Sequence, residues 1–247
     1  MRSKASFCTA LGCALLLGAT LAAPVSAGLF DRIKNARGGS GGDAVAALST
    51  EDISGGLKEA LRVGTETVVA NLGQTDGFNL DEQIHIPLPD SLDKVRNVLS
   101  KVGADSMLND LELRLNRAAE IATPKAKQLF VNAIQDMTLD DVMGIYNGPE
   151  DAATQYFKTK MSPDLITEMT PVVDDSLDDA GVVQTYDSVM AQYNAVPFVP
   201  KVDADLSEYV VGKGIDGIFY YLAKEEAAIR QDPAKRTTDI LKRVFAK

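Results

Sequence analysis

Apolar residues recur every three or four positions through almost the whole chain after Thr50, and this spacing constrains the fold more than any other feature. It places apolar side chains on one face of an α-helix, and no segment alternates as a half-buried strand would. We therefore predict an all-α fold, a single compact bundle of about eight to ten helices. The clearest sets are Ile53, Leu57, Leu61, Gly64, Val68 and Leu72; Leu108, Leu111, Leu115, Ala118 and Ala122; and Val211, Ile215, Ile218 and Leu222.

Several prolines directly follow residues with capping side chains, a pairing that is typical of the first turn of a helix. The pairs predict helix starts, although the one at Thr170 could instead kink a long helix. Residues 138–141, "TLDD", predict a further start as a capping box with aspartate in place of glutamate. The four pairs are Thr123-Pro124, Ser162-Pro163, Thr170-Pro171 and Asp232-Pro233.

Two connections interrupt the helical pattern, at residues 73–92 and 194–209. Pro87 and Pro89 exclude a helix around them, so the first connection could pair a few extended residues as a short β-ribbon. In the second, Phe198 lies between prolines, and we expect it to plug into the core. Loops on a rigid scaffold carry function, so both connections are candidate functional surfaces.

The first 27 residues are typical of a signal peptide, with a basic start followed by the apolar run "ALGCALLLGATLAA". The run is too short for a membrane anchor, and "VSA" before Gly28 fits a cleavage site. The alternative is a lipoprotein anchored through Cys13. We expect residues 28–49 to form a tether, with a short helix and a glycine-rich linker, and residues 50–247 to form the helical domain, with no transmembrane helix in the mature chain.

Composition excludes several kinds of chemistry from the mature chain. Cys8 and Cys13 both lie in the leader, so disulfides, thiolate catalysis and cysteine metal sites are excluded. Cleavage removes two of the 25 basic residues and none of the 35 acidic ones, so the net charge of −10 becomes −12. Such an acidic surface repels nucleic acid and anionic lipid. No motif indicates a cofactor.

Five blocks of sequence occur in the same order as in the bacterial domain-of-unknown-function family 4197, which the chain resembles from about Ile53 to Phe245. The resemblance implies an exported all-helical domain of Gram-negative-type bacteria, and with the leader we expect a periplasmic location. It implies no assigned activity and no catalytic residues. The blocks are "IPLPDSLDKV", "LNRAAEIATPKAKQLFVNAI", "MTLDDVMGIYNGPEDAATQYFK", "YNAVPF" and "RTTDILKRVF".

Residues 148–157, "GPEDAATQYF", read mainly as a helix end followed by a helix start. Glu150 and Asp151 place negative charge at the positive end of the new helix, so they exclude an anion site there. Ala153, Tyr156 and Phe157 form an apolar stripe. Helix rules do not account for Thr154 and Gln155, which with Tyr156 are candidate ligand-binding residues.

The single histidine, His85, excludes zinc sites built from several imidazoles and hydrolases that need a histidine base beside their nucleophile. We interpret His85 as a hydrogen-bonded loop residue, with a proton shuttle, a pH-sensitive latch or a ligand contact as alternatives. Asn116, Arg117 and Arg236 are candidate ligand contacts, since an arginine binds carboxylate or phosphate. The alternative is that these three residues tie helices together.

Two groups of carboxylates are candidates for chemistry. Glu225 and Glu226 follow an aromatic cluster and could cleave a glycosidic bond, but Glu226 is also spaced to pair with Arg230 one turn on. An exposed pair of this kind contributes roughly a few tenths of a kcal/mol. The second group lies along one helix face, which suits a solvated surface better than a calcium site. It consists of Asp174, Asp175, Asp178 and Asp179.

These observations favour a non-enzymatic envelope protein that binds a small ligand or an envelope protein through loops on a helical scaffold. The alternative is a carboxylate-dependent hydrolase that acts on cell-wall or lipid material.

Export predicts that the native protein begins at Gly28, because "VSA" is the best cleavage site after the apolar run. Mass spectrometry of the protein from its own cells measures the start directly. An intact Met1, or a lipid on Cys13, would contradict cleavage at this site.

Overall fold

The computed structural model describes residues 48–245, which belong to one compact unit that begins at Ala47. The predicted leader, the lipidation alternative at Cys13 and the tether up to residue 47 lie outside the described residues. Within residues 48–245 no helix is long and apolar enough to cross a membrane.

The described residues form eight α-helices and no strand, which confirms the all-α prediction. The short β-ribbon considered for residues 73–92 does not form, since this connection makes turns and then runs extended to a short 3-10 helix. The helices are α2 (Thr50–Leu72), α3 (Asp93–Leu99), α4 (Asp105–Asp136), α5 (Leu139–Tyr146), α6 (Ala152–Asp179), α7 (Val182–Asn194), α8 (Leu206–Gln231) and α9 (Asp239–Val244).

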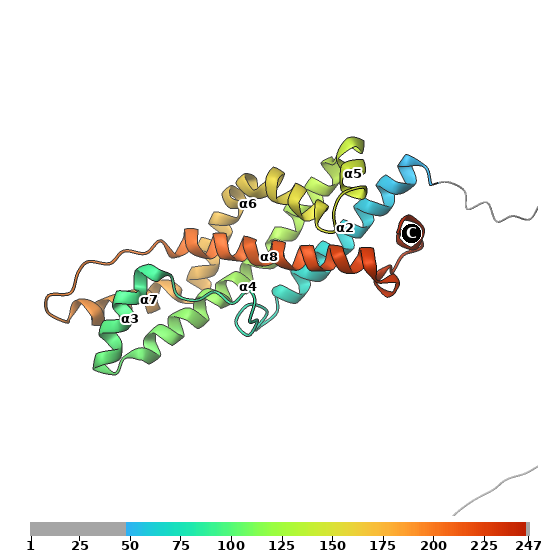
Figure 1. Cartoon of the computed structure of the whole chain (residues 1–247). Coiled ribbons are helices and arrows are strands. Elements are labelled where there is room, and N and C mark those ends of the chain that lie inside the picture. Colours follow the sequence, from blue (N-terminus) through green and yellow to red (C-terminus); the bar gives the residue numbers. More distant parts are fainter. Residues whose placement is uncertain (1–47, 246–247) are drawn as a thin grey trace, which may run out of the picture. The chain divides into compact units, whose positions relative to one another are not determined.

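The four long helices build the bundle (Figure 1). Helix α6 packs on α4 and α8, and α2 also packs on these two helices. The short helices α5 and α9 pack on α2, whereas α7 packs on α4 and α3 packs on α7. Three buried rings bring α4, α6 and α8 together. Phe130 meets Phe157 and Phe219 edge to face, with ring centroids 6.0 Å and 5.8 Å apart.

The capping box at residues 138–141 is confirmed. The hydroxyl of Thr138 accepts from the backbone N–H of Asp141, and the Asp141 carboxylate accepts from the backbone N–H of Thr138, at 3.2 Å and 3.0 Å. Asp232 also caps as predicted, because its carboxylate accepts from Ala234 N–H where a 3-10 helix begins at Pro233.

Three predicted helix starts are wrong, because Pro124 lies inside α4 and Pro163 and Pro171 lie inside α6. At Thr170 the alternative of one continuous helix is confirmed. The hydroxyl before each proline donates backwards to the carbonyl four residues earlier, so it does not cap a new helix. These bonds are Thr123 to Ala119 at 2.7 Å, Ser162 to Lys158 at 2.6 Å and Thr170 to Ile166 at 2.7 Å.

The expectation that Phe198 plugs into the core is also wrong. Its relative exposure is 105%, and its φ of +63° lies in the left-handed region that L-residues other than asparagine and aspartate rarely adopt. Tyr193 enters the core instead, with its ring buried and its hydroxyl donating to the Pro200 carbonyl at 2.9 Å. That bond closes the loop, which leaves Phe198 in solvent at the tip.

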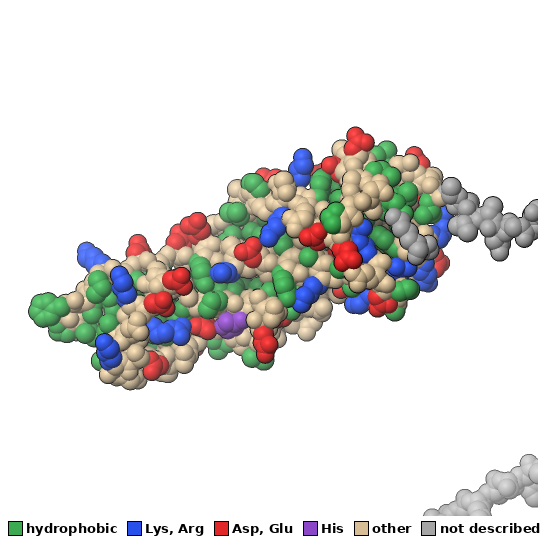
Figure 2. Space-filling view, viewed as in Figure 1, with side chains coloured by type: hydrophobic (Ala, Val, Ile, Leu, Met, Phe, Trp, Pro, Cys, Tyr) green, Lys and Arg blue, Asp and Glu red, His purple; other side chains and the backbone are tan. Residues whose placement is uncertain are grey.

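Acidic and basic side chains are interspersed over the face seen in Figure 2, with no single-sign patch covering it. The histidine is visible there among charged neighbours.

Changing Phe198 to asparagine is expected to raise the free energy of unfolding by about 1 kcal/mol. The reason is that a left-handed residue other than glycine or asparagine costs roughly 1–2 kcal/mol, and this ring buries no surface to offset it. Phe198→Ala keeps the strain and serves as the matched control, with a change within about 0.5 kcal/mol. Urea denaturation measures both. If the free energy of unfolding of Phe198→Asn is no higher than that of Phe198→Ala, the backbone at the tip is not strained.

Candidate functional site

A groove of about 580 Å³ lies between α2, residues 76–81 of the long connection, and α8. Its walls combine apolar side chains with three carboxylates and one ammonium group. The lining residues are Thr67, Val68, Asn71, Leu72, Asp76, Gly77, Leu80, Asp81, Tyr221, Lys224, Glu225 and Ala228.

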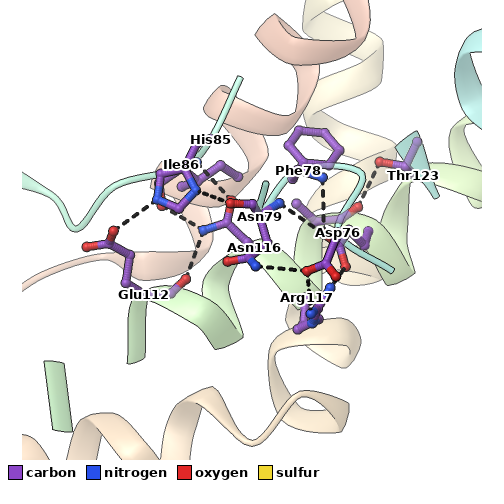
Figure 3. A network of polar contacts seen from close by, with 11 residues as sticks. Asp76, Phe78, Asn79, His85, Ile86, Glu112, Asn116, Arg117 and Thr123 are labelled. Carbon is purple, nitrogen blue, oxygen red and sulfur yellow. Dashed lines mark hydrogen bonds and ion pairs between the residues drawn. The ribbon is translucent and has the colours of Figure 1, made fainter. Parts of the chain in front are cut away.

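The connection that forms one wall of this groove is held on α4 by a polar stripe of residues spaced four apart: Glu112, Asn116 and Glu120. Asn116 is fully buried, and its side-chain amide forms two hydrogen bonds with the backbone of Ile86 (Figure 3). Its oxygen accepts from Ile86 N–H at 2.9 Å, and its nitrogen donates to the Ile86 carbonyl at 2.8 Å. The amide thus replaces the partner strand that this extended segment lacks.

Glu120 satisfies the turn at the start of the same connection. It is buried, and one carboxylate oxygen accepts from the backbone N–H groups of Phe78 and Asn79, each at 3.1 Å. The other oxygen pairs with Arg117 at 2.6 Å, and Arg117 pairs with Asp76 at 2.6 Å. The hydrogen bond that Arg117 donates to Glu120, followed by the one that it donates to Asp76, raises the pKa of Arg117.

His85 joins the connection to α4 through both ring nitrogens (Figure 3). Nδ1 lies 2.8 Å from the Asn79 carbonyl oxygen and Nε2 lies 2.9 Å from Glu112. Both partners accept hydrogen bonds, so a ring protonated on both nitrogens donates to each. Burial would raise the pKa of Glu112, but hydrogen bonds from His85 and Arg96 outweigh it and hold that pKa below its ordinary value.

Close approaches fix the path of the connection. Phe78 is fully buried, and a Cβ on Gly217 of α8 would lie 2.8 Å from its ring. A Cβ on Gly77 would lie 2.5 Å from the Leu72 carbonyl oxygen. Glycine is therefore needed at both positions, because any larger residue would push the connection away from α2 or α8.

The α8 wall of the groove carries aromatic and charged groups. The Tyr221 hydroxyl donates a short hydrogen bond to Asp81, which raises the pKa of Tyr221 to about 12. Lys224 Nζ lies over the rings of Tyr220 and Tyr221, 4.4 Å and 5.5 Å from their centroids. Burial would raise the pKa of Asp81, but the bonds from Tyr221 and from backbone N–H groups hold it below its ordinary value.

The two adjacent glutamates of α8 do not share a site. Glu225 lines the groove, with its carboxylate 3.5 Å from Lys235. Glu226 is buried on the inner side of α8 and accepts from the backbone N–H groups of Ala153 and Thr154, at 2.9 Å and 3.0 Å. Neighbouring residues on a helix point about 100° apart, which accounts for the separation.

Glu226 therefore caps the start of α6, in the stretch that the sequence singled out. The Thr154 hydroxyl, also buried, donates to the same carboxylate at 3.0 Å. Arg230 pairs with Glu226 at 2.9 Å and donates to the Ile145 carbonyl at 2.9 Å. The sequence predicts that Glu150 and Asp151 exclude an anion from the start of α6. The Glu226 carboxylate of α8 nevertheless binds there, and Thr154 takes part in binding it.

Three other candidates lie apart from the groove. Gln155 is exposed and donates to Asp151 at 3.0 Å. Tyr156 is half-buried and lines, with Gln155, a shallow hollow of about 430 Å³ between α5 and α6. Arg236 donates to the carbonyls of Ile229 and Arg230, at 3.1 Å and 2.9 Å, and so caps the end of α8. The guanidinium of Arg236 thus ties elements of the fold together.

The four aspartates near the end of α6 are all exposed, and Asp174 accepts a hydrogen bond from Ser207. Among residues 48–245, no three histidine, cysteine, aspartate or glutamate side chains are close enough to hold a metal ion.

Sequence reasoning found three of the residues that fix the connection, His85, Asn116 and Arg117, but missed others. It did not identify Glu112 and Glu120 as partners of the connection, although their spacing around Asn116 puts all three on one helix face. The charged residues of the groove that it missed are Asp76, Asp81 and Lys224.

A family model described as "Protein of unknown function (DUF4197)" matches residues 47–246, which include every residue that the structure describes. Neither a curated protein nor a solved structure matches the chain.

Changing Glu226 to glutamine is expected to lower the free energy of unfolding by about 3 kcal/mol. The change leaves Arg230 without a counter-charge in a buried site, whereas an exposed pair would lose only a fraction of this. Glu225→Gln, on the groove side, is the neighbouring control and should cost less than about 1 kcal/mol. Guanidinium denaturation compares the two. Equal small losses would mean that the buried cap contributes little to stability.

Proposed function

The chain belongs to the DUF4197 family, and we propose that it is a non-enzymatic protein of the bacterial envelope that binds a small ligand in the groove between α2, residues 76–81 and α8. The observation that carries the proposal is the groove itself. Its volume of about 580 Å³ is in the range of small-molecule sites, roughly 300–1,000 Å³.

The groove is also preformed, which favours binding. Its loop wall is tied to α4 through Glu120 and Asn116, and the buried ring of Phe78 rests on Gly217 of α8. A ligand therefore does not have to order this wall on binding. Its apolar lining residues can cover the body of a ligand, and its polar groups can orient it.

The positions of Glu225 and Glu226 argue against a hydrolase that uses this pair of carboxylates. A glycosidase needs two carboxyl groups on either side of one bond. Glu225 lines the groove, whereas Glu226 is held by backbone N–H groups of α6 and by Arg230. A carboxylate committed in this way is not available to a substrate in the groove. The envelope location is supported by the leader sequence.

Binding predicts that at least one class in a ligand panel raises the melting temperature of the mature protein. The panel contains amines, carboxylates, sugars, peptidoglycan fragments and divalent metals. A ligand at about one hundred times its Kd adds roughly 2.7 kcal/mol, which corresponds to a shift of about 5–10 °C in a domain of this size. The same samples are analysed for reaction products, since hydrolysis would release them.

The matched variants are Ala228→Trp, which fills the groove, and Ala191→Trp, at an exposed position of α7 that does not line the groove. The shift should disappear in the first and remain in the second. A shift that survives Ala228→Trp, or no shift with any class, would contradict a ligand site in the groove.

A further inference from the structure

We infer that the ligand is a cation: the groove takes a molecule that carries an ammonium or guanidinium group on an apolar body. This inference rests on the proposed function and adds the chemical class of the ligand. The cavity defines the site, and the groups that line it define what fits.

The charged groups in the lining are unequal in sign. Three of them are carboxylates, Asp76, Asp81 and Glu225, and one is the ammonium of Lys224. Asp76 is paired with Arg117 at 2.6 Å and Glu225 with Lys235 at 3.5 Å, and both of these cations lie outside the lining. The surface that faces a ligand therefore carries more negative than positive groups, which favours a ligand cation over a carboxylate or phosphate.

The carboxylates keep acceptor capacity that the described residues do not use. Asp76 Oδ1 accepts from Asn79 and Arg117, whereas Oδ2 accepts no hydrogen bond within residues 48–245. Glu225 Oε2 lies 3.5 Å from Lys235, and Oε1 has no ion-pair or hydrogen-bond partner in the same part of the chain. An ionised carboxylate is an acceptor only, so such oxygens select donors.

Two of the carboxylates are held in the charged form. Hydrogen bonds from Asn79 and then Arg117 lower the pKa of Asp76. The pKa of Asp81 is also below its ordinary value. Both groups are therefore anionic at neutral and mildly acidic pH.

Donors are scarce in the same lining. The Thr67 hydroxyl already donates to the Val63 carbonyl at 2.9 Å. The Tyr221 hydroxyl donates to Asp81. The amide of Asn71 and the ammonium of Lys224 remain, so a ligand that brings only acceptors would find few partners.

The position of Lys224 is independent support for a cation at this edge of the groove. Its ammonium rests on the faces of Tyr220 and Tyr221 and forms no ion pair within residues 48–245. The side chain is exposed, so it can swing away and leave the ring faces and Asp81 to a ligand cation.

The rest of the lining fits an apolar body. Val68, Leu72 and Ala228 line the same cavity, and Leu80 stands at its edge with 73% of its surface exposed. An alkyl chain against these residues buries apolar surface on both partners, including that of Leu80. The groove thus fits a small molecule that combines an ammonium or guanidinium group with an apolar body.

The test is calorimetric titration of the mature protein at constant ionic strength with three six-carbon probes: hexane-1,6-diamine, hexane-1,6-diol and adipate. We expect saturable binding of the diamine, and no binding of the diol or adipate. Glu225→Gln and, separately, Asp76→Asn should each weaken the diamine about tenfold, the loss expected for one charge-assisted hydrogen bond. Asp175→Asn, an exposed aspartate far along α6, is the charge-matched control and should leave the Kd unchanged.

The outcomes separate the ligand class from the site. Binding of the diol or adipate in place of the diamine, abolished by Ala228→Trp, would overturn the cation and leave the groove as a binding site. Diamine binding that is insensitive to Glu225→Gln, Asp76→Asn and Ala228→Trp would be general surface ion pairing and would also overturn the cation. If no probe binds, the cation is overturned, and the ligand panel alone decides whether the groove binds other compounds.

Discussion

A long connection with little regular secondary structure needs hydrogen-bond partners for its backbone, and in this protein α4 supplies several of them. Residues 73–92 lie over the bundle, and the stripe Glu112, Asn116 and Glu120 accepts four of their backbone N–H groups, while the Asn116 amide also donates to the Ile86 carbonyl. An unpaired buried N–H or carbonyl would cost on the order of 1–3 kcal/mol. The groove exists because these bonds hold the connection at a fixed distance from α2 and α8, with Phe78 filling the space beneath it.

The same physical solution occurs at the start of α6. There Glu226 reaches across from α8 and accepts from two backbone N–H groups and a threonine hydroxyl. In both places the acceptor is a carboxylate from a distant helix, paired with an arginine that balances its charge, Arg117 for Glu120 and Arg230 for Glu226. In both places a buried carboxylate accepts backbone N–H groups from another segment of the chain, and its pairing with arginine offsets the cost of burying the charge.

The fold could be predicted from the sequence because apolar spacing is local and helices are local structures. The errors arose where one sequence pattern has two physical outcomes. A hydroxyl before proline can cap the next helix or bond back to its own, and only packing around Pro124 and Pro163 decides which. Tyr193 is buried and Phe198 is exposed, and the spacing of these aromatic residues does not predict which of them enters the core. The backbone N–H groups that Glu120 and Glu226 accept from lie more than forty residues away along the chain, so no local pattern identifies them.

The adjacency of Glu225 and Glu226 fixes the rotational register of α8. Rotating this helix about its axis to move Glu225 or Tyr221 relative to the groove would withdraw the Glu226 carboxylate from α6 and Arg230 from the Ile145 carbonyl. The α8 wall of the groove therefore cannot rotate about its helix axis without breaking these hydrogen bonds. Adjustment to a ligand falls to exposed side chains such as Leu80 and Lys224, which can change rotamer without disturbing a backbone bond.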